Sequence, residues 1–152
     1  LDLSSTQIKT AALQSGYVDK GTFGPNDCNG FFNSTAASRI KDWLKDGIKF
    51  VVDATQCTGT LRFAVHASGG MFNPGMTSDA VILVNKYHNG LSSQWWTNGS
   101  APGTSPGPHN IFTIQPDEVA DRNPTCAGRN RMQLNSVWGR TEVNMMFYTP
   151  CG

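Results

Sequence analysis

Two short stretches in the first half of the chain show the period of a β-strand. In residues 48–54, and again in residues 61–67, apolar side chains recur at every second position, which is the spacing at which side chains line one face of a sheet. Thr58 and Gly59 lie between the two stretches, and a turn-forming pair in that place is typical of a β-hairpin. We therefore expect these stretches to pair as a hairpin around which the remaining elements are organised.

Two helices are predicted near the start of the chain. Residues 4–15 open on serines, carry apolar residues at helical spacing and are followed by Gly16, which predicts a short helix. Residues 36–46 follow a serine and a threonine that can cap a helix, and Gly47 is placed to end it. The apolar stripe of this second helix consists of Ala36, Ala37, Ile40, Trp43 and Leu44. We expect that stripe to lie across the sheet.

The second half of the chain predicts further strands. Residues 79–87 are apolar on both alternations, as in a central strand that is covered on both faces. Residues 111–114 predict a short strand, and residues 116–122 a helical turn. Residues 131–138 and 141–148 alternate about a Gly-Arg pair, which predicts a second hairpin.

The order of these elements contains no β-α-β pattern, which favours a sheet that is mainly antiparallel. We therefore expect an α+β fold, with one or two short helices packed on that sheet and two disulfides. The 152 residues are close to the common size of one domain, so residues 1–152 are expected to form a single domain.

The cysteines are even in number and have no C-x-x-C spacing, which speaks against zinc and for disulfides in an oxidising compartment. They are Cys28, Cys57, Cys126 and Cys151. Three pairings are possible. We prefer Cys28 with Cys57, which clips the second helix to the hairpin, and Cys126 with Cys151, which tethers the last residues.

The composition favours a secreted protein. Charged residues make up 15% of the chain and the formal net charge is +1, so no overall field draws the protein to nucleic acid or to an anionic membrane. No apolar run is long enough to span a bilayer, and no leader-like segment opens the chain. Asn33 and Asn98 each begin an N-x-S/T sequon and are candidate glycosylation sites.

The histidines offer candidates for acid-base chemistry but not for metal binding. None of the three has a spacing to another histidine or to a carboxylate that makes a helical metal face, so no metal site is expected. A small secreted hydrolase acting on phosphodiesters would use histidine and glutamate with an arginine that holds the phosphate. The candidates for that chemistry are His66, His109, Glu118 and Arg122.

A long, almost uncharged loop is the stronger functional signal. Residues 89–110 are rich in Gly, Pro and polar residues and contain Trp95 and Trp96. Aromatic rings among amides and hydroxyls suit a sugar ring or a protein partner, and loops of this length are often functional. The alternative is that one or both tryptophans pack under their own loop. Tyr87 and His88 adjoin the loop and complete the predicted binding set. No cofactor is expected, because the glycine-rich runs lack the lysine and helix of a phosphate loop.

Three functions remain open on these grounds. The first is a secreted binding or effector-like protein that recognises a glycan or an extracellular protein through the tryptophan loop. The second is the small ribonuclease-like hydrolase, which is the one case in which nucleic acid would be a partner. The third is a structural subunit of an extracellular filament or coat, which would also account for the charge-poor surface and the disulfides.

Overall fold

The computed structural model describes residues 3–30, 34–63, 77–89, 109–119, 121, 123, 132–134 and 143–150. Within these residues there are two helices and eight strands. In chain order they are α1 Ser5–Gln14, β1 Val18–Thr22, α2 Thr35–Trp43, β2 Phe50–Ala54, β3 Leu61–Phe63, β4 Ala80–Val84, β5 Tyr87–Asn89, β6 His109–Ile114, β7 Gln133–Leu134 and β8 Val143–Tyr148.

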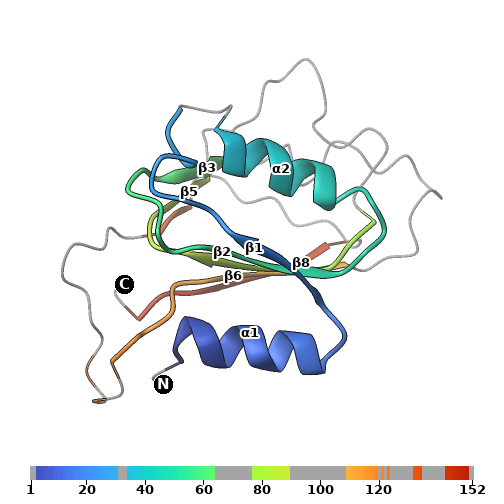
Figure 1. Cartoon of the computed structure of the whole chain (residues 1–152), viewed down its shortest axis with the longest axis horizontal. Coiled ribbons are helices and arrows are strands. Elements are labelled where there is room, and N and C mark those ends of the chain that lie inside the picture. Colours follow the sequence, from blue (N-terminus) through green and yellow to red (C-terminus); the bar gives the residue numbers. More distant parts are fainter. Residues whose placement is uncertain are drawn as a thin grey trace.

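The strands form two parallel sheets. The large sheet has the order β1-β2-β4-β6-β8 and the small sheet the order β3-β5-β7, and every neighbouring pair in both is parallel. From β2 onward the chain alternates between the sheets, so each connection between neighbours of the large sheet crosses to a second layer. Helix α2 makes the first of these crossings, and β3, β5 and β7 make the others (Figure 1).

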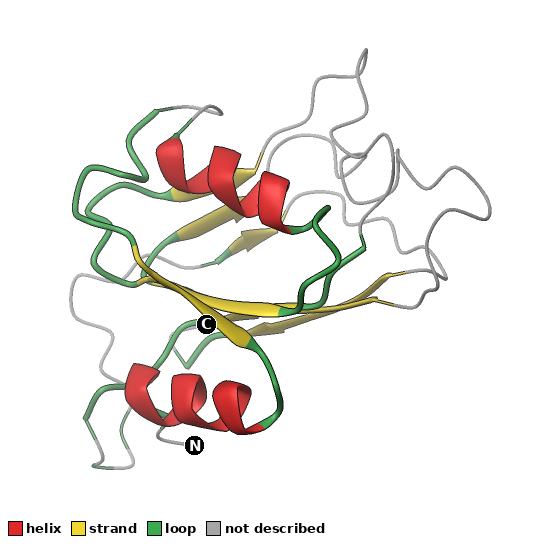
Figure 2. Cartoon of the chain, turned by 45° about the vertical axis from the view of Figure 1, so that its right-hand side comes forward, coloured by secondary structure: helices red, strands yellow, loops and turns green. Residues whose placement is uncertain are grey.

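The large sheet is therefore the middle of three layers. Helix α1 covers one of its faces, while α2 and the small sheet lie over the other (Figure 2). The main core fills the space on the α2 side, where the large sheet contributes alternate residues such as Phe50, Val52 and Ile82. Val51 and Leu83 point to the α1 side and belong to a smaller apolar cluster. The central strands β2 and β4 are consequently buried at every position.

The expected α+β fold with a mainly antiparallel sheet is wrong, because all five strands of the large sheet are parallel. Strands do form at β2 and β3, but they do not pair with one another. The turn signal between them has another cause. A Cβ atom at Gly59 would lie 2.7 Å from Oδ1 of Asn29 and 3.1 Å from the carbonyl oxygen of Cys28. Gly59 is thus favoured by the close approach of this segment to the loop around Cys28 and does not mark a hairpin turn.

The second predicted hairpin is wrong for a similar reason. Strand β7 pairs with β5 and β8 pairs with β6, each in parallel. Residues 79–87 do contain a central strand covered on both faces, but β4 ends at Val84 and the chain bends before β5. A run that is apolar on both faces is typical of parallel sheets. Residues 116–119 are not helical, so the described part of the predicted helical turn at 116–122 is also wrong.

One disulfide is seen, where two were expected. Cys28 and Cys57 are bonded, with their Cα atoms 5.6 Å apart, as the preferred pairing predicts. The bond links the loop before α2 to the segment between β2 and β3. Cys126 and Cys151 lie outside the described residues, so their pairing stays a prediction.

Both helices form where the sequence predicts them. The side chain of Ser4 accepts a hydrogen bond from the backbone of Gln7 in a capping box, and Ser34 caps α2 in the same way through the Ala37 N–H. The α2 stripe is buried except for Trp43, which is half-buried. No helix among the described residues is long and apolar enough to cross a membrane.

Candidate functional site

An apolar cleft lies between α1 and the face of the large sheet that α1 covers. Its volume is about 420 Å³. The residues from α1 and its approach include Leu3, Ala11 and Ala12, and those from the sheet are Val81, Phe112 and Ile114. No charged side chain is among its described lining residues.

The cleft exists because α1 lies over only part of this face. Ile8 and Ala12 of α1 are buried against Val51, Val81 and Leu83 of strands β2 and β4, whereas Phe112 on β6 is only partly buried. Ala12, on the sheet side of α1, leaves room that a larger side chain would fill. The large sheet thus presents an apolar surface beside α1 that the described part of the chain does not cover.

The two ends of the cleft differ in polarity. At one end the Lys49 ammonium donates a hydrogen bond to the carbonyl of Ser15 at 2.7 Å and lies 5.1 Å from the ring centroid of Tyr17. Burial, and to a lesser degree the negative charge of Asp79, raises the pKa of the Tyr17 phenol. The Lys49 ammonium therefore lies at that end, over the ring of Tyr17.

The other end, near Leu3, is tied to the chain segment after β6. The Asp117 N–H donates to the carbonyl of Leu3 at 2.9 Å, and the Glu118 carboxylate accepts a hydrogen bond from the Ser5 N–H at 3.0 Å. Glu118 thus satisfies one of the free N–H groups at the start of α1, where a negative charge is favoured. Its observed contact is structural.

A second, polar pocket of about 330 Å³ lies where β4 and β6 begin. Parallel pairing brings the starts of these strands together, so that Nδ1 of His109 lies 3.4 Å from Oδ1 of Asp79. The same carboxylate oxygen accepts the Asn110 N–H at 2.9 Å. A carboxylate that orients an imidazole is one part of a general-base site, but the hydroxyl of Ser78 beside it is engaged with the carbonyl of Trp43 at 2.9 Å.

The structure does not bring the described hydrolase candidates together. His109 is the first residue of β6, while Glu118 follows the other end of that strand. His66 and Arg122 lie outside the described residues. Asp79, the residue that does contact His109, was not predicted. Asp79 directly precedes the apolar strand β4, and His109 is the first residue of β6. These positions predict a contact between the two side chains only once β4 and β6 are known to be parallel neighbours.

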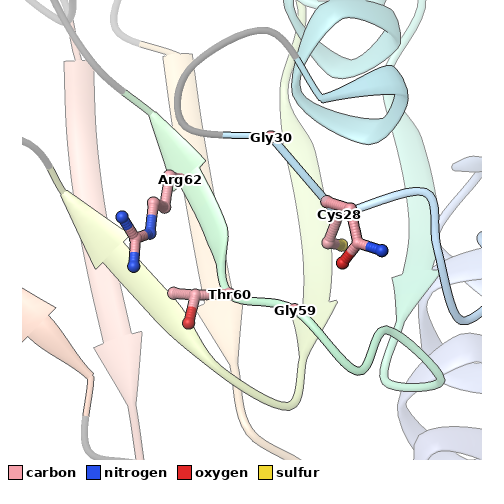
Figure 3. A pocket seen from close by; sticks show the side chains of 6 residues that line it. Cys28, Gly30, Gly59, Thr60 and Arg62 are labelled. Carbon is pink, nitrogen blue, oxygen red and sulfur yellow. The ribbon is translucent and has the colours of Figure 1, made fainter.

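A third pocket, of about 340 Å³, lies beside the disulfide. Gly30 and Gly59 form part of its wall, and Arg62 is the one charged residue among its described lining residues. In the close view the guanidinium of Arg62 points away from Cys28 (Figure 3). This arrangement does not converge on a common point, and we assign no chemistry to it.

The predicted binding residues are placed only in part. Tyr87 is 1% exposed and its ring centroid lies 5.8 Å from that of Phe147, so Tyr87 is a core residue rather than a contact for a partner. His88 belongs to β5, where its backbone pairs with Arg62 and Gln133. Trp95 and Trp96 lie outside the described residues. The same holds for the sequon residues, which are Asn33 and Asn98.

The burial of Tyr87 predicts a loss of stability at alkaline pH. Burial raises the pKa of its phenol well above the ordinary 10.0, so the folded chain holds this proton more tightly than the unfolded chain. This contribution to the free energy of unfolding is complete below about pH 10. It is lost as the pH rises further, by about 1.4 kcal/mol per pH unit. Urea unfolding at about pH 9 and about pH 11 should show a smaller loss for Tyr87→Phe. Equal losses in both proteins would contradict the assignment.

No group of three or more metal-ligating side chains is found among the described residues. The candidate sites are therefore the apolar cleft and, less completely assembled, the Asp79–His109 pocket. No known protein-family model and no curated protein matches the sequence, and no solved structure matches the fold.

Proposed function

We propose that this protein is a binding protein, and that its ligand carries an unbranched apolar chain with an anionic end. The apolar chain would occupy the cleft between α1 and the large sheet. The observation that carries the proposal is the apolar lining of this cleft together with the Lys49 ammonium, which contacts the lining residues Ser15 and Tyr17 at one end of it and itself lines the polar pocket.

The size and lining of the cleft support a small apolar ligand. Its volume of about 420 Å³ falls in the range of pockets that hold small molecules, and such pockets are mostly apolar with a few polar groups that fix orientation. A sugar is less suited to this place, because hydroxyl groups held against Val81, Phe112 and Ile114 would lose their hydrogen bonds to water.

The positive charge at one end of the cleft is the reason for proposing an anionic group on the ligand. Lys49 supplies a positive charge, 5.1 Å from the centroid of the Tyr17 ring. Hydrogen bonds that involve an ionised partner are stronger than neutral ones. An acyl chain that ends in a carboxylate therefore combines the apolar part and the charged end that the cleft and Lys49 would bind.

Dodecanoate is a suitable probe for this proposal. Isothermal titration of the full chain should show one site, and Ala11→Leu should weaken binding at least about tenfold because leucine fills the cleft. Thr10→Leu is the matched control. It places the same side chain on α1 at an exposed position that does not line the cleft, and its affinity should equal that of the wild type.

The charged end has its own comparison within that experiment. Lys49→Met should weaken binding of dodecanoate by about tenfold while leaving binding of dodecanol nearly unchanged. The proposal would be wrong if the wild type bound neither compound, or if Ala11→Leu and Thr10→Leu behaved alike.

The other functional expectations stay predictions. Recognition of a glycan or an extracellular protein through Trp95 and Trp96 concerns residues outside the described part of the chain. The extracellular location, expected from the composition and the cysteines, is likewise a prediction. One observation favours the hydrolase alternative, which is that the Asp79 carboxylate orients the imidazole of His109. No further candidate catalytic residue among the described residues joins this pair.

A further inference from the structure

Strand β8 is the last strand of the large sheet. It pairs with β6 on one side, and among the described residues no strand pairs with its other side. The carbonyl of Tyr148 accepts a hydrogen bond from the Gln115 N–H at 2.9 Å and so points toward β6. Backbone groups of a strand point alternately to its two sides, so those of Met145 and Phe147 point away from β6. An edge of this kind is a template for another strand.

The sequence of β8 lacks the features that normally protect such an edge. Proteins usually blunt an edge strand with charged side chains, prolines or bulges. The strand reads VNMMFY and contains none of the first two, and it pairs with β6 in an unbroken register. Met146, near its middle, is 53% exposed.

The opposite edge of the same sheet is protected. Strand β1 reads VDKGT, and its pairing with β2 is shifted between Asp19 and Thr22. Both charged side chains of β1 form ion pairs, Asp19 with Lys9 at 3.2 Å and Lys20 with Asp46 at 3.4 Å. Among the described residues, β8 therefore forms the less protected edge of the large sheet.

We propose that β8 pairs antiparallel with β8 of a second copy of this chain, about a two-fold axis. The strand carries no charge, so self-pairing opposes no like charges. In such a pair, Met145 and Phe147 of both copies stay on the side of the main core, and Met146 of both copies stays on the α1 side. The two large sheets then form one continuous sheet that is closed by symmetry. This inference does not depend on the ligand proposed for the cleft.

The contact is small, and this sets the conditions of the test. Six residues of strand span about 20 Å, so we expect a weak dimer with a dissociation constant of about 10 micromolar. Sedimentation equilibrium between about 1 and about 300 micromolar should then show a shift toward twice the 16.5 kDa of one chain. A wild type that stays monomeric over this range would overturn the proposal.

Charges placed on β8 test which surface is used. Met146→Lys and Met146→Glu should each raise the dissociation constant at least about tenfold, because like charges then face one another or the neighbouring residue of the partner strand. An equimolar mixture of the two variants should dimerise at least as well as the wild type. Full dimerisation of either variant alone would overturn the proposal. Failure of the mixture would do so as well, because it would show that residue 146 of one copy does not lie near residue 146 of the other.

Amide hydrogen exchange of the wild type covers the case in which the variants fail to fold. The N–H groups of Met145 and Phe147 should exchange at least about tenfold more slowly at the highest protein concentration than at the lowest. The N–H groups of Met146 and Tyr148, which point toward β6, should exchange at the same rate at both concentrations. Concentration-independent exchange of Met145 and Phe147 would overturn the proposal.

Discussion

Leu44→Ala is expected to lower the free energy of unfolding by about 2 to 5 kcal/mol. Leu44 follows the last residue of α2, is 0% exposed and belongs to the main core between α2 and the large sheet. Truncation removes buried apolar surface and leaves a cavity, because the carbonyl of Leu44 is held by the Thr77 N–H at 2.9 Å and the backbone cannot close the gap. Urea unfolding of both proteins measures the change.

Leu13→Ala provides the matched control for this result. Leu13 lies on α1 and is 46% exposed, so the same chemical change should cost less than about 1 kcal/mol. The m-values of the two variants should equal that of the wild type, which would show that the unfolded state is unchanged. A loss below about half a kcal/mol for Leu44→Ala would mean that α2 does not pack on the large sheet as described.

The helices could be predicted because their signals are local. The cap at Ser34 and the spacing of Ala36, Ala37, Ile40 and Leu44 lie within one short stretch, and the structure buries each of these apolar side chains. Strand positions could be predicted for the same reason, since alternation is read from neighbouring residues. The stretches around Phe50 and Leu61 do become strands.

The pairing of the strands could not be predicted, because it depends on residues far apart in the sequence. The alternation at Phe50 and Val52 predicts one buried face, although Val51 between them is also apolar. Burial of all five residues of β2 is typical of a parallel strand. The signal at Gly59 was ambiguous as well, because a glycine serves a close backbone approach as readily as a turn.

The candidate site shares this dependence on topology. The cleft combines residues from α1 with Val81 on β4 and Phe112 on β6, and nothing in their spacing shows that they meet. Asp79 and His109 are likewise 30 residues apart, and they meet because β4 and β6 start side by side in register. These residues are far apart in the sequence, and they come together because β4 and β6 are parallel neighbours in the large sheet.

Removal of the disulfide is expected to lower the free energy of unfolding by about 3 to 4 kcal/mol. Cys28 and Cys57 are 29 residues apart, and the bond therefore prevents the unfolded chain from opening a loop that contains α2 and β2. The double variant Cys28→Ala with Cys57→Ala leaves both side chains apolar at their buried positions. Its urea m-value should rise, because the unfolded chain without the bond exposes more surface.

The wild type supplies the second half of this test. Peptide mapping without reduction should recover Cys28 linked to Cys57, as the structure shows, and Cys126 linked to Cys151, as the sequence predicts. A link between Cys57 and Cys126 would contradict both assignments. If the double variant lost less than about 1 kcal/mol, the loop between β1 and α2 would be held by its other contacts. Those contacts include the hydrogen bond from the Thr58 N–H to the carbonyl of Pro25 at 3.0 Å.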